Sequence, residues 1–98
     1  MKIYFSPCVS INKKVIDYKF EDERVEATYN GNTDVFDFSN IEDNKPPLCY
    51  PESVLEDDLG ISPILEVKRV DGQLYVKVLQ FIEDNAEDKD CFPDWVSV

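Results

Sequence analysis

The clearest pattern in the chain is the alternation of apolar and polar positions on both sides of Asp71-Gly72. Residues 65–70 and 73–79 each alternate with the period of two that is typical of strands with one buried face. Asp-Gly readily adopts the positive φ values of a type I′ turn, and such a two-residue loop sets the register of the hairpin. That register pairs three sets of side chains across the strands: Val67 with Val76, Leu65 with Val78, and Glu66 with Lys77. Apolar pairs fall on one face and the charge pair on the other, so we expect this hairpin to be the stability centre.

A second hairpin is predicted in the N-terminal half. Residues 24–29 and 33–38 flank Asn30-Gly31, which places Val25 opposite Phe36 in another two-residue hairpin. Residues 13–20 also alternate and predict a strand before it, with residues 21–23 as the connecting turn.

Shorter elements are predicted outside the hairpins. Residues 1–5 form an apolar opening that Pro7 interrupts, which indicates an edge strand because proline cannot donate to a ladder. Residues 39–50, rich in Asn and Pro, indicate a loop or extended crossover. Residues 92–98, with Trp95, indicate a last strand or an apolar plug.

One short helix is predicted over residues 51–59. Leu55 and Leu59 would share a face of this helix and Gly60 would end it. The acidic run 56–58 then lies at the C-terminal end of the helix, where the helix dipole disfavours negative charge.

These elements indicate one domain over residues 1–98. The expected fold is mainly β: a small antiparallel β-sandwich or partly open barrel, built from two hairpins plus flanking strands with at most one short helix. With 43% hydrophobic residues the chain has enough core-forming side chains to fold.

The net charge of the chain limits the kinds of partner that it can bind. Ten Lys and Arg against 21 Asp and Glu give a net charge of −11 and a pI near 4.2. Such a field repels nucleic acid and anionic lipid and attracts basic surfaces, so we expect a protein partner with a basic surface and no direct nucleic-acid binding. No apolar run approaches the length of a membrane span, so we expect no membrane contact.

The residue types that are missing argue against catalysis. The chain has no His, which removes the usual general base and every Cys-His or Ser-His nucleophile pair. Its three Cys are widely spaced, without a C-x-x-C motif or a secretory apolar region before them. We therefore expect a non-enzymatic protein of a reducing cytoplasm, with no cofactor and no metal.

An acidic segment at residues 83–90 has three interpretations. It holds five carboxylates and no Gly, whereas an EF-hand loop needs a central Gly. A calcium site is therefore the least favoured interpretation, and a surface for a basic partner and an ordinary solvated loop remain open. The candidate partner-binding residues are the members of this segment, the acidic run before Gly60 and one aromatic: Glu83, Asp84, Glu87, Asp88, Asp90, Glu56, Asp57, Asp58 and Trp95.

Three further interpretations concern the Cys, the paired acids and the aromatic residues. Cys8, Cys49 and Cys91 with one carboxylate would satisfy zinc's tetrahedron, although their spacing is unpaired. Asp34 and Asp37, or Glu21 and Glu23, could form a carboxylate pair for glycoside chemistry. The aromatic residues are more typical of a packed core than of a stacking platform, which would need cations around it.

Four segments carry a family resemblance: residues 1–7, 35–39, 68–76 and 91–98. In their order and spacing they resemble short acidic proteins encoded in the tail-gene region of tailed bacteriophages and prophages. The resemblance implies a phage context, in the bacterial host cytoplasm or in the virion, and it supplies no catalytic residues. Residues 41–59 match nothing in that group.

Two functions of different classes follow. The first is a non-enzymatic, tail-associated structural or assembly factor that acts through an exposed strand edge and acidic loops. The second is an acidic inhibitor that imitates the phosphate backbone and occupies the nucleic-acid groove of a host defence protein. The oligomeric state is left open.

Overall fold

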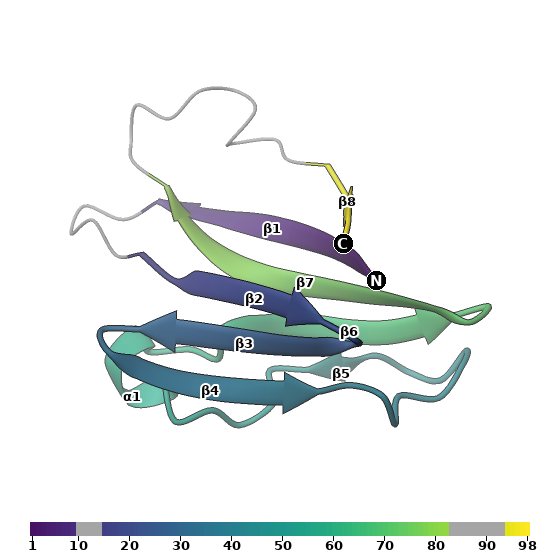
Figure 1. Ribbon diagram of the computed structural model, residues 1–98. Helices are drawn as coiled ribbons and strands as arrows, with labels where there is room; N and C mark the ends of the chain where they lie inside the picture. Colours follow the sequence, from purple (N-terminus) through teal and green to yellow (C-terminus); the bar gives the residue numbers. More distant parts are fainter. Residues whose placement is uncertain (10–14, 83–93) are drawn as a thin grey trace.

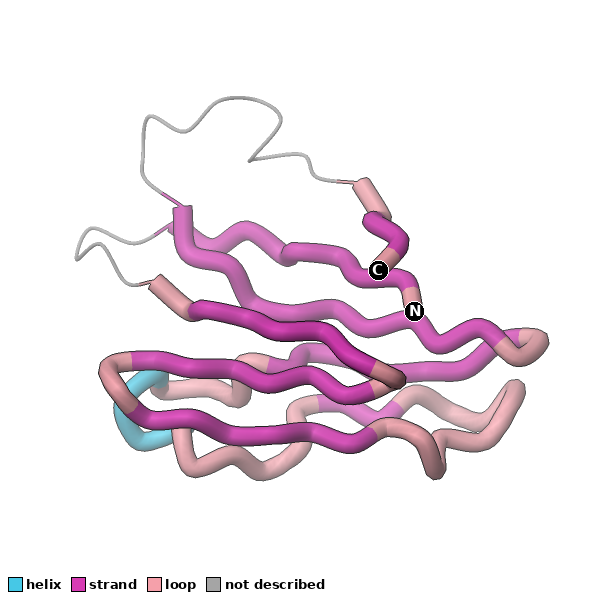
Figure 2. Tube along the Cα trace, viewed as in Figure 1, coloured by secondary structure: helices cyan, strands magenta, loops and turns pink. Residues whose placement is uncertain are grey.

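The chain folds into two β-sheets with one short helix in a computed structural model, which describes residues 1–9, 15–82 and 94–98 (Figure 1). Strands dominate the trace and the helix is a single turn (Figure 2). The elements are β1 (Lys2–Val9), β2 (Asp17–Glu21), β3 (Arg24–Tyr29), β4 (Asn32–Asp37), β5 (Leu48–Cys49), α1 (Glu56–Leu59), β6 (Ile64–Val70), β7 (Gln73–Ile82) and β8 (Val96–Ser97). The mainly β prediction is confirmed, and the described strands form no closed barrel.

The small sheet has the order β2-β3-β4 and is antiparallel throughout. Asn30 and Gly31 turn the chain with φ values of 53° and 82°, and Val25 pairs with Phe36 as predicted. Asp22 and Glu23 make the preceding turn, and both have positive φ although neither is glycine. This turn therefore stores backbone strain that the surrounding structure must offset.

The predicted hairpin over residues 65–79 is confirmed as β6 and β7, with one correction. Val67 pairs with Val76 and Glu66 with Lys77, but Ile64 rather than Leu65 lies opposite Val78. An irregularity between Ile64 and Glu66 inserts one extra residue into β6, as a β-bulge does. The side chain of Ile64 thereby enters the core, and Leu65 stays half-buried.

The large sheet has the order β5-β6-β7-β1-β8 and is mixed. The expectation of a wholly antiparallel sandwich is wrong at one pairing, because β1 runs parallel to β7 over Lys2–Val9. A parallel pair needs a long crossover, and here the whole small sheet lies between the two strands in the chain. The strand predicted for residues 1–5 continues through Pro7. Proline is tolerated at this position because, among the described residues, β8 pairs with β1 only at Lys2 and Ile3, so that this side of β1 has no partner strand at Pro7.

The core lies between the two sheets, and α1 closes one end of it. Leu55 and Leu59 are buried on one side, as predicted. The helix starts at Glu56 rather than Pro51, so the acidic run is in its first turn and not at the C-terminal end that the sequence suggested. Gly60 ends the helix in the left-handed region at φ 80°, as predicted.

Two polar side chains link the sheets. Tyr18 on β2 donates its hydroxyl hydrogen to the Leu79 carbonyl oxygen on β7, and burial raises the pKa of that hydroxyl. Arg69 on β6 binds the Glu23 carboxylate at 2.7 Å and donates its Nε hydrogen to the Ile41 carbonyl oxygen, also at 2.7 Å. The strained turn at Glu23 is thus held against the large sheet by an ion pair.

Candidate functional site

A group of carboxylates lies around α1. We call it the acidic corner, and it consists of Asp34, Glu52, Glu56, Asp57 and Asp58 together with Ser53 and Val54. Glu52, Asp57 and Asp58 are exposed, and Asp34 and Glu56 are half-buried.

The corner is assembled from two parts of the chain that are distant in sequence. Asp34 lies on β4, and its Oδ2 accepts a hydrogen bond from the Val54 backbone N–H at 3.2 Å. One pleat earlier on the same strand, Asn32 donates from Nδ2 to Asp58 Oδ2 at 3.4 Å. Buried Leu55 and Leu59 anchor the segment from below, so the carboxylates sit on a fixed backbone.

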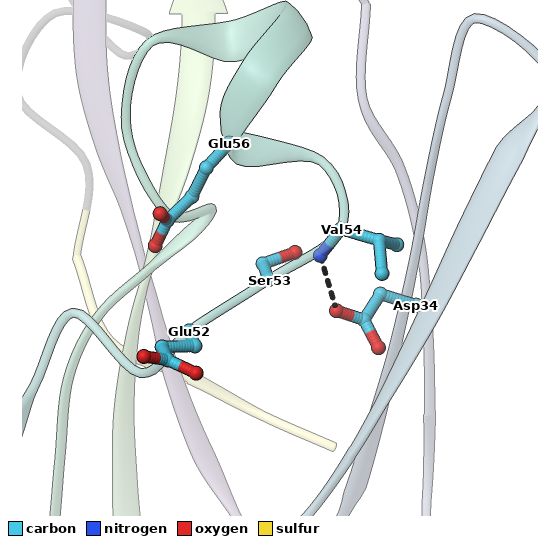
Figure 3. Close-up of a pocket in the computed structure, with 5 residues that line it drawn as sticks. All are labelled: Asp34, Glu52, Ser53, Val54 and Glu56. Carbon is cyan, nitrogen blue, oxygen red and sulfur yellow. Dashed lines mark hydrogen bonds between the residues drawn. The ribbon is translucent and has the colours of Figure 1, made fainter.

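The corner surrounds an open hollow of about 500 Å³ that is lined by Asp34, Glu52, Ser53, Val54 and Glu56 (Figure 3). The Asp34 carboxylate points toward the Val54 N–H, and the side chains of Glu52 and Glu56 project on the other side of the same segment. None of these five lining residues is basic. Val54 is 70% exposed on the Asp34 side of this segment, so the corner offers an apolar contact next to a carboxylate (Figure 3).

The carboxylates of the corner can attract cationic side chains. Among the described residues, no group of three or more His, Cys, Asp or Glu side chains is arranged to hold a metal ion. Carboxylates and an exposed apolar residue can provide electrostatic attraction and a small desolvated contact, as charged and apolar groups do in protein interfaces.

The sequence-predicted candidates fall into three groups. Glu56, Asp57 and Asp58 are brought together in the acidic corner. Trp95 lies elsewhere, half-buried with its ring centroid 5.4 Å from those of both Tyr4 and Tyr75. Five candidates lie outside the described residues: Glu83, Asp84, Glu87, Asp88 and Asp90.

Two alternative sites from the sequence are wrong. Asp34 and Asp37 lie three residues apart on β4 and so face opposite sides of the strand, which excludes a carboxylate pair. Cys8 on β1 and Cys49 on β5 are separated by three strand spacings, about 14 Å. The two thiols cannot share a zinc ion, and Cys91 lies outside the described residues.

Sequence reasoning missed two members of the corner, Asp34 and Glu52. Asp34 is an inward position of β4 by alternation, but only the structure shows that it binds the backbone N–H of Val54 in the segment before α1. Glu52 was assigned to the first turn of a helix, whereas the structure places it in the loop before α1. A single segment of the sequence does not show that like charges from distant parts of the chain come together near an exposed valine.

The acidic character extends over the small sheet. Residues 17–37 contain seven Asp and Glu against two Lys and Arg. Two of these acids have depressed pKa values for local reasons. The backbone N–H of Ser39, and secondarily Arg24, lowers the pKa of Asp37, and a hydrogen bond from Arg69 lowers the pKa of Glu23.

Comparisons of the chain with protein-family models, with curated proteins and with solved structures each gave no match. The part of the chain that the structure describes contains no helix with the length and apolar character of a membrane span.

Proposed function

We propose that this chain is a non-enzymatic binding protein whose acidic corner contacts the basic surface of a partner protein. The observation that carries the proposal is the hollow beside α1, which is lined by three carboxylates and the exposed Val54, with no Lys or Arg among its five described lining residues. Charged groups of one sign that lie without counter-charges attract a complementary surface and speed its association.

The absence of His from the sequence supports a role without catalysis. The family resemblance supports a phage setting, in which the partner is a tail protein or an assembly factor. The protein then acts in the bacterial host cytoplasm and stays there or enters the virion with its partner.

A second function is favoured by the charge of the small sheet. Seven acids against two bases over residues 17–37, on a hydrogen-bonded β scaffold, present a broad array of negative charge. Such an array can occupy the nucleic-acid groove of a host defence protein as a mimic of the phosphate backbone.

The test is affinity capture from infected host cells with three baits. These are the wild type, a corner variant with Glu52→Gln, Glu56→Gln and Asp57→Asn, and a control variant with Asp17→Asn, Glu21→Gln and Glu42→Gln. Both variants remove three negative charges from exposed or half-buried positions. Circular dichroism first verifies that both retain the wild-type fold.

Tail or assembly proteins that bind the wild type and the control variant, but not the corner variant, support the first function. A nuclease or other nucleic-acid-binding protein that is lost with both variants, and is displaced by added DNA, supports the second function. Equal capture by all three baits contradicts both.

A further inference from the structure

The outer face of the large sheet carries a surface of opposite character to the acidic corner. Lys2 pairs with Tyr75 and Tyr4 with Lys77 across β1 and β7, and Lys68 pairs with Tyr75 across β6 and β7. Paired residues of neighbouring strands share a face, so these side chains form one patch. We call it the aromatic–lysine face, and its members are Lys2, Tyr4, Lys68, Tyr75, Lys77 and Trp95.

Three rings form the centre of this face. Trp95 meets Tyr4 at a tilt of 52° and Tyr75 edge-on at 90°. The Lys77 ammonium lies 5.9 Å from the centroid of the Tyr4 ring, at the limit of a cation–π contact. All three rings are half-buried, which leaves part of each available to a partner.

The charge of the face is positive in a strongly negative protein. At the described paired positions of the face, three lysines accompany one carboxylate, Glu66, which lies 3.9 Å from Lys68 and 3.8 Å from Lys77. Aromatic anchors inside a charged rim are typical of protein interfaces, where Tyr and Trp are frequent hot spots. A nucleic acid is disfavoured here, because a phosphate would lie beside Glu66 and within the field of a chain of net charge −11.

The aromatic–lysine face complements the acidic corner in charge and also offers it an apolar contact. The corner has an exposed valine and carboxylates, and the face has half-buried aromatic rings and ammonium groups. Val54 of one copy can pack on the rings of another, while Glu52 and Glu56 approach its lysines.

The acidic corner and the Trp95 end of the aromatic–lysine face lie at opposite ends of the strands. In Figure 1, α1 is at one end of the strands, and β8, which follows Trp95, is at the other end beside the start of β1. A contact between different surfaces at opposite ends is heterologous, and it propagates into a ring or an open chain.

We propose that the aromatic–lysine face docks the acidic corner of a second copy, so that the protein assembles head to tail. This inference rests on the proposed function, since it names a partner for the same acidic corner.

Salt provides a distinctive signature of this contact. At low ionic strength the net charges of two copies repel one another over about 30 Å, whereas at 0.1 M screening limits this repulsion to about 10 Å. At about 1 M the ion pairs at the contact are themselves screened. Association is therefore strongest at intermediate salt, whereas binding to a partner of opposite net charge weakens steadily.

The test is sedimentation velocity at up to about 1 mM protein, a range that detects weak association. A face variant carries Lys68→Gln and Lys77→Gln, and its charge-matched control carries Lys19→Gln and Lys45→Gln, which lie elsewhere. We expect the face variant and the corner variant each to raise the apparent Kd about tenfold, and the control to change it less than twofold. The two impaired variants retain one intact contact between them, so an equimolar mixture should form a dimer that does not grow further.

Trp95 is the single tryptophan, so its fluorescence reports this face directly. We expect its emission to change with concentration in the wild type and not in the corner variant. A wild type that stays monomeric at every salt concentration overturns the inference. If oligo(dT) quenches Trp95 in that monomer, the face binds nucleic acid instead.

Failure of this inference is separable from failure of the proposed function. A monomeric wild type that captures a partner through the acidic corner contradicts the head-to-tail contact alone. If neutralising the corner changes neither capture nor self-association, the proposed function is contradicted as well.

Discussion

Arg69 links the two sheets through several contacts of its side chain. Its guanidinium binds Glu23 on the small sheet, the Ile41 carbonyl oxygen, the Phe38 carbonyl oxygen and the Gly72 carbonyl oxygen. The side chain is 13% exposed, so few of these contacts can be replaced by water without movement of the loops. This single side chain joins the turn at Glu23, the segment after β4 and the β6–β7 hairpin.

Arg69→Met should lower the free energy of unfolding by about 2–3 kcal/mol, because several carbonyl oxygens and the Glu23 carboxylate lose a charged donor. Arg24→Met is the control, since Arg24 pairs with Asp37 at 3.6 Å with 63% of its side chain exposed. Its cost should stay below about 1 kcal/mol. Urea unfolding measures both, and equal losses would show that Arg69 is an ordinary surface ion pair.

The Glu23–Arg69 pair also predicts a pH dependence. The pKa of Glu23 is lower in the folded protein than its ordinary value of about 4.3, so the pair stabilises the fold above that pH and is lost as the pH falls through the folded pKa. The stability difference between the wild type and Glu23→Gln should thus be widest above about pH 5 and narrow toward pH 3. A difference that is constant across this range contradicts the ion pair.

Val76 tests the interior at the same scale. It is fully buried and pairs with Val67 on the inner face of the hairpin. Val76→Ala should cost about 1–3 kcal/mol through lost burial and a cavity, and lower the melting temperature by several degrees. A melting temperature within about one degree of wild type would show that the inner face is misassigned.

At the scale of elements, the two hairpins could be predicted and the rest only in part. Asp71-Gly72 and Asn30-Gly31 encode their turns locally, and alternation then sets which side chains meet. The bulge at Leu65 could not be read from that pattern, because it depends on how Ile64 packs in the core. The parallel pairing of β1 with β7 is also determined by tertiary packing, since no local pattern in residues 2–9 indicates which strand they pair with.

The acidic corner could be predicted only in part, because it too depends on tertiary packing. The run 56–58 is visible in the sequence, but its place in the first turn of α1 depends on where the helix begins, and its proximity to Asp34 depends on the small sheet. The aromatic–lysine face was missed because its members come from four strands or their ends, although the outward positions of the hairpin already place Lys68, Tyr75 and Lys77 together.

Gly60 tests how the end of α1, and with it the backbone of the acidic corner, is stabilised. It ends α1 at φ 80°, and a Cβ there would meet nothing within 4 Å, so a substitution brings backbone strain and no clash. Gly60→Ala should cost about 1 kcal/mol and Gly60→Asn less, because Asn tolerates the left-handed region. Thermal unfolding of both variants measures this, and equal costs would point to a contact rather than strain.

The whole molecule has an uneven charge distribution. Many acids of the described residues lie on the small sheet and around α1, while three lysines and three aromatic rings share the outer face of the large sheet. A net charge of −11 exceeds the magnitude of about 2–8 that is sufficient to keep a small domain in solution, and the self-repulsion that it causes is unfavourable for folding. We infer that the excess negative charge serves binding.

The most direct test of this claim is the association rate of the captured partner as a function of ionic strength, measured for the wild type, the corner variant and the control variant. If the acidic corner is the contact, the wild-type rate should fall steeply between about 0.05 and 0.5 M salt, as expected for electrostatic steering. The corner variant should bind more slowly with a shallower salt dependence, while the control stays close to wild type. A corner variant that associates as fast as wild type, with the same salt dependence, would contradict the account.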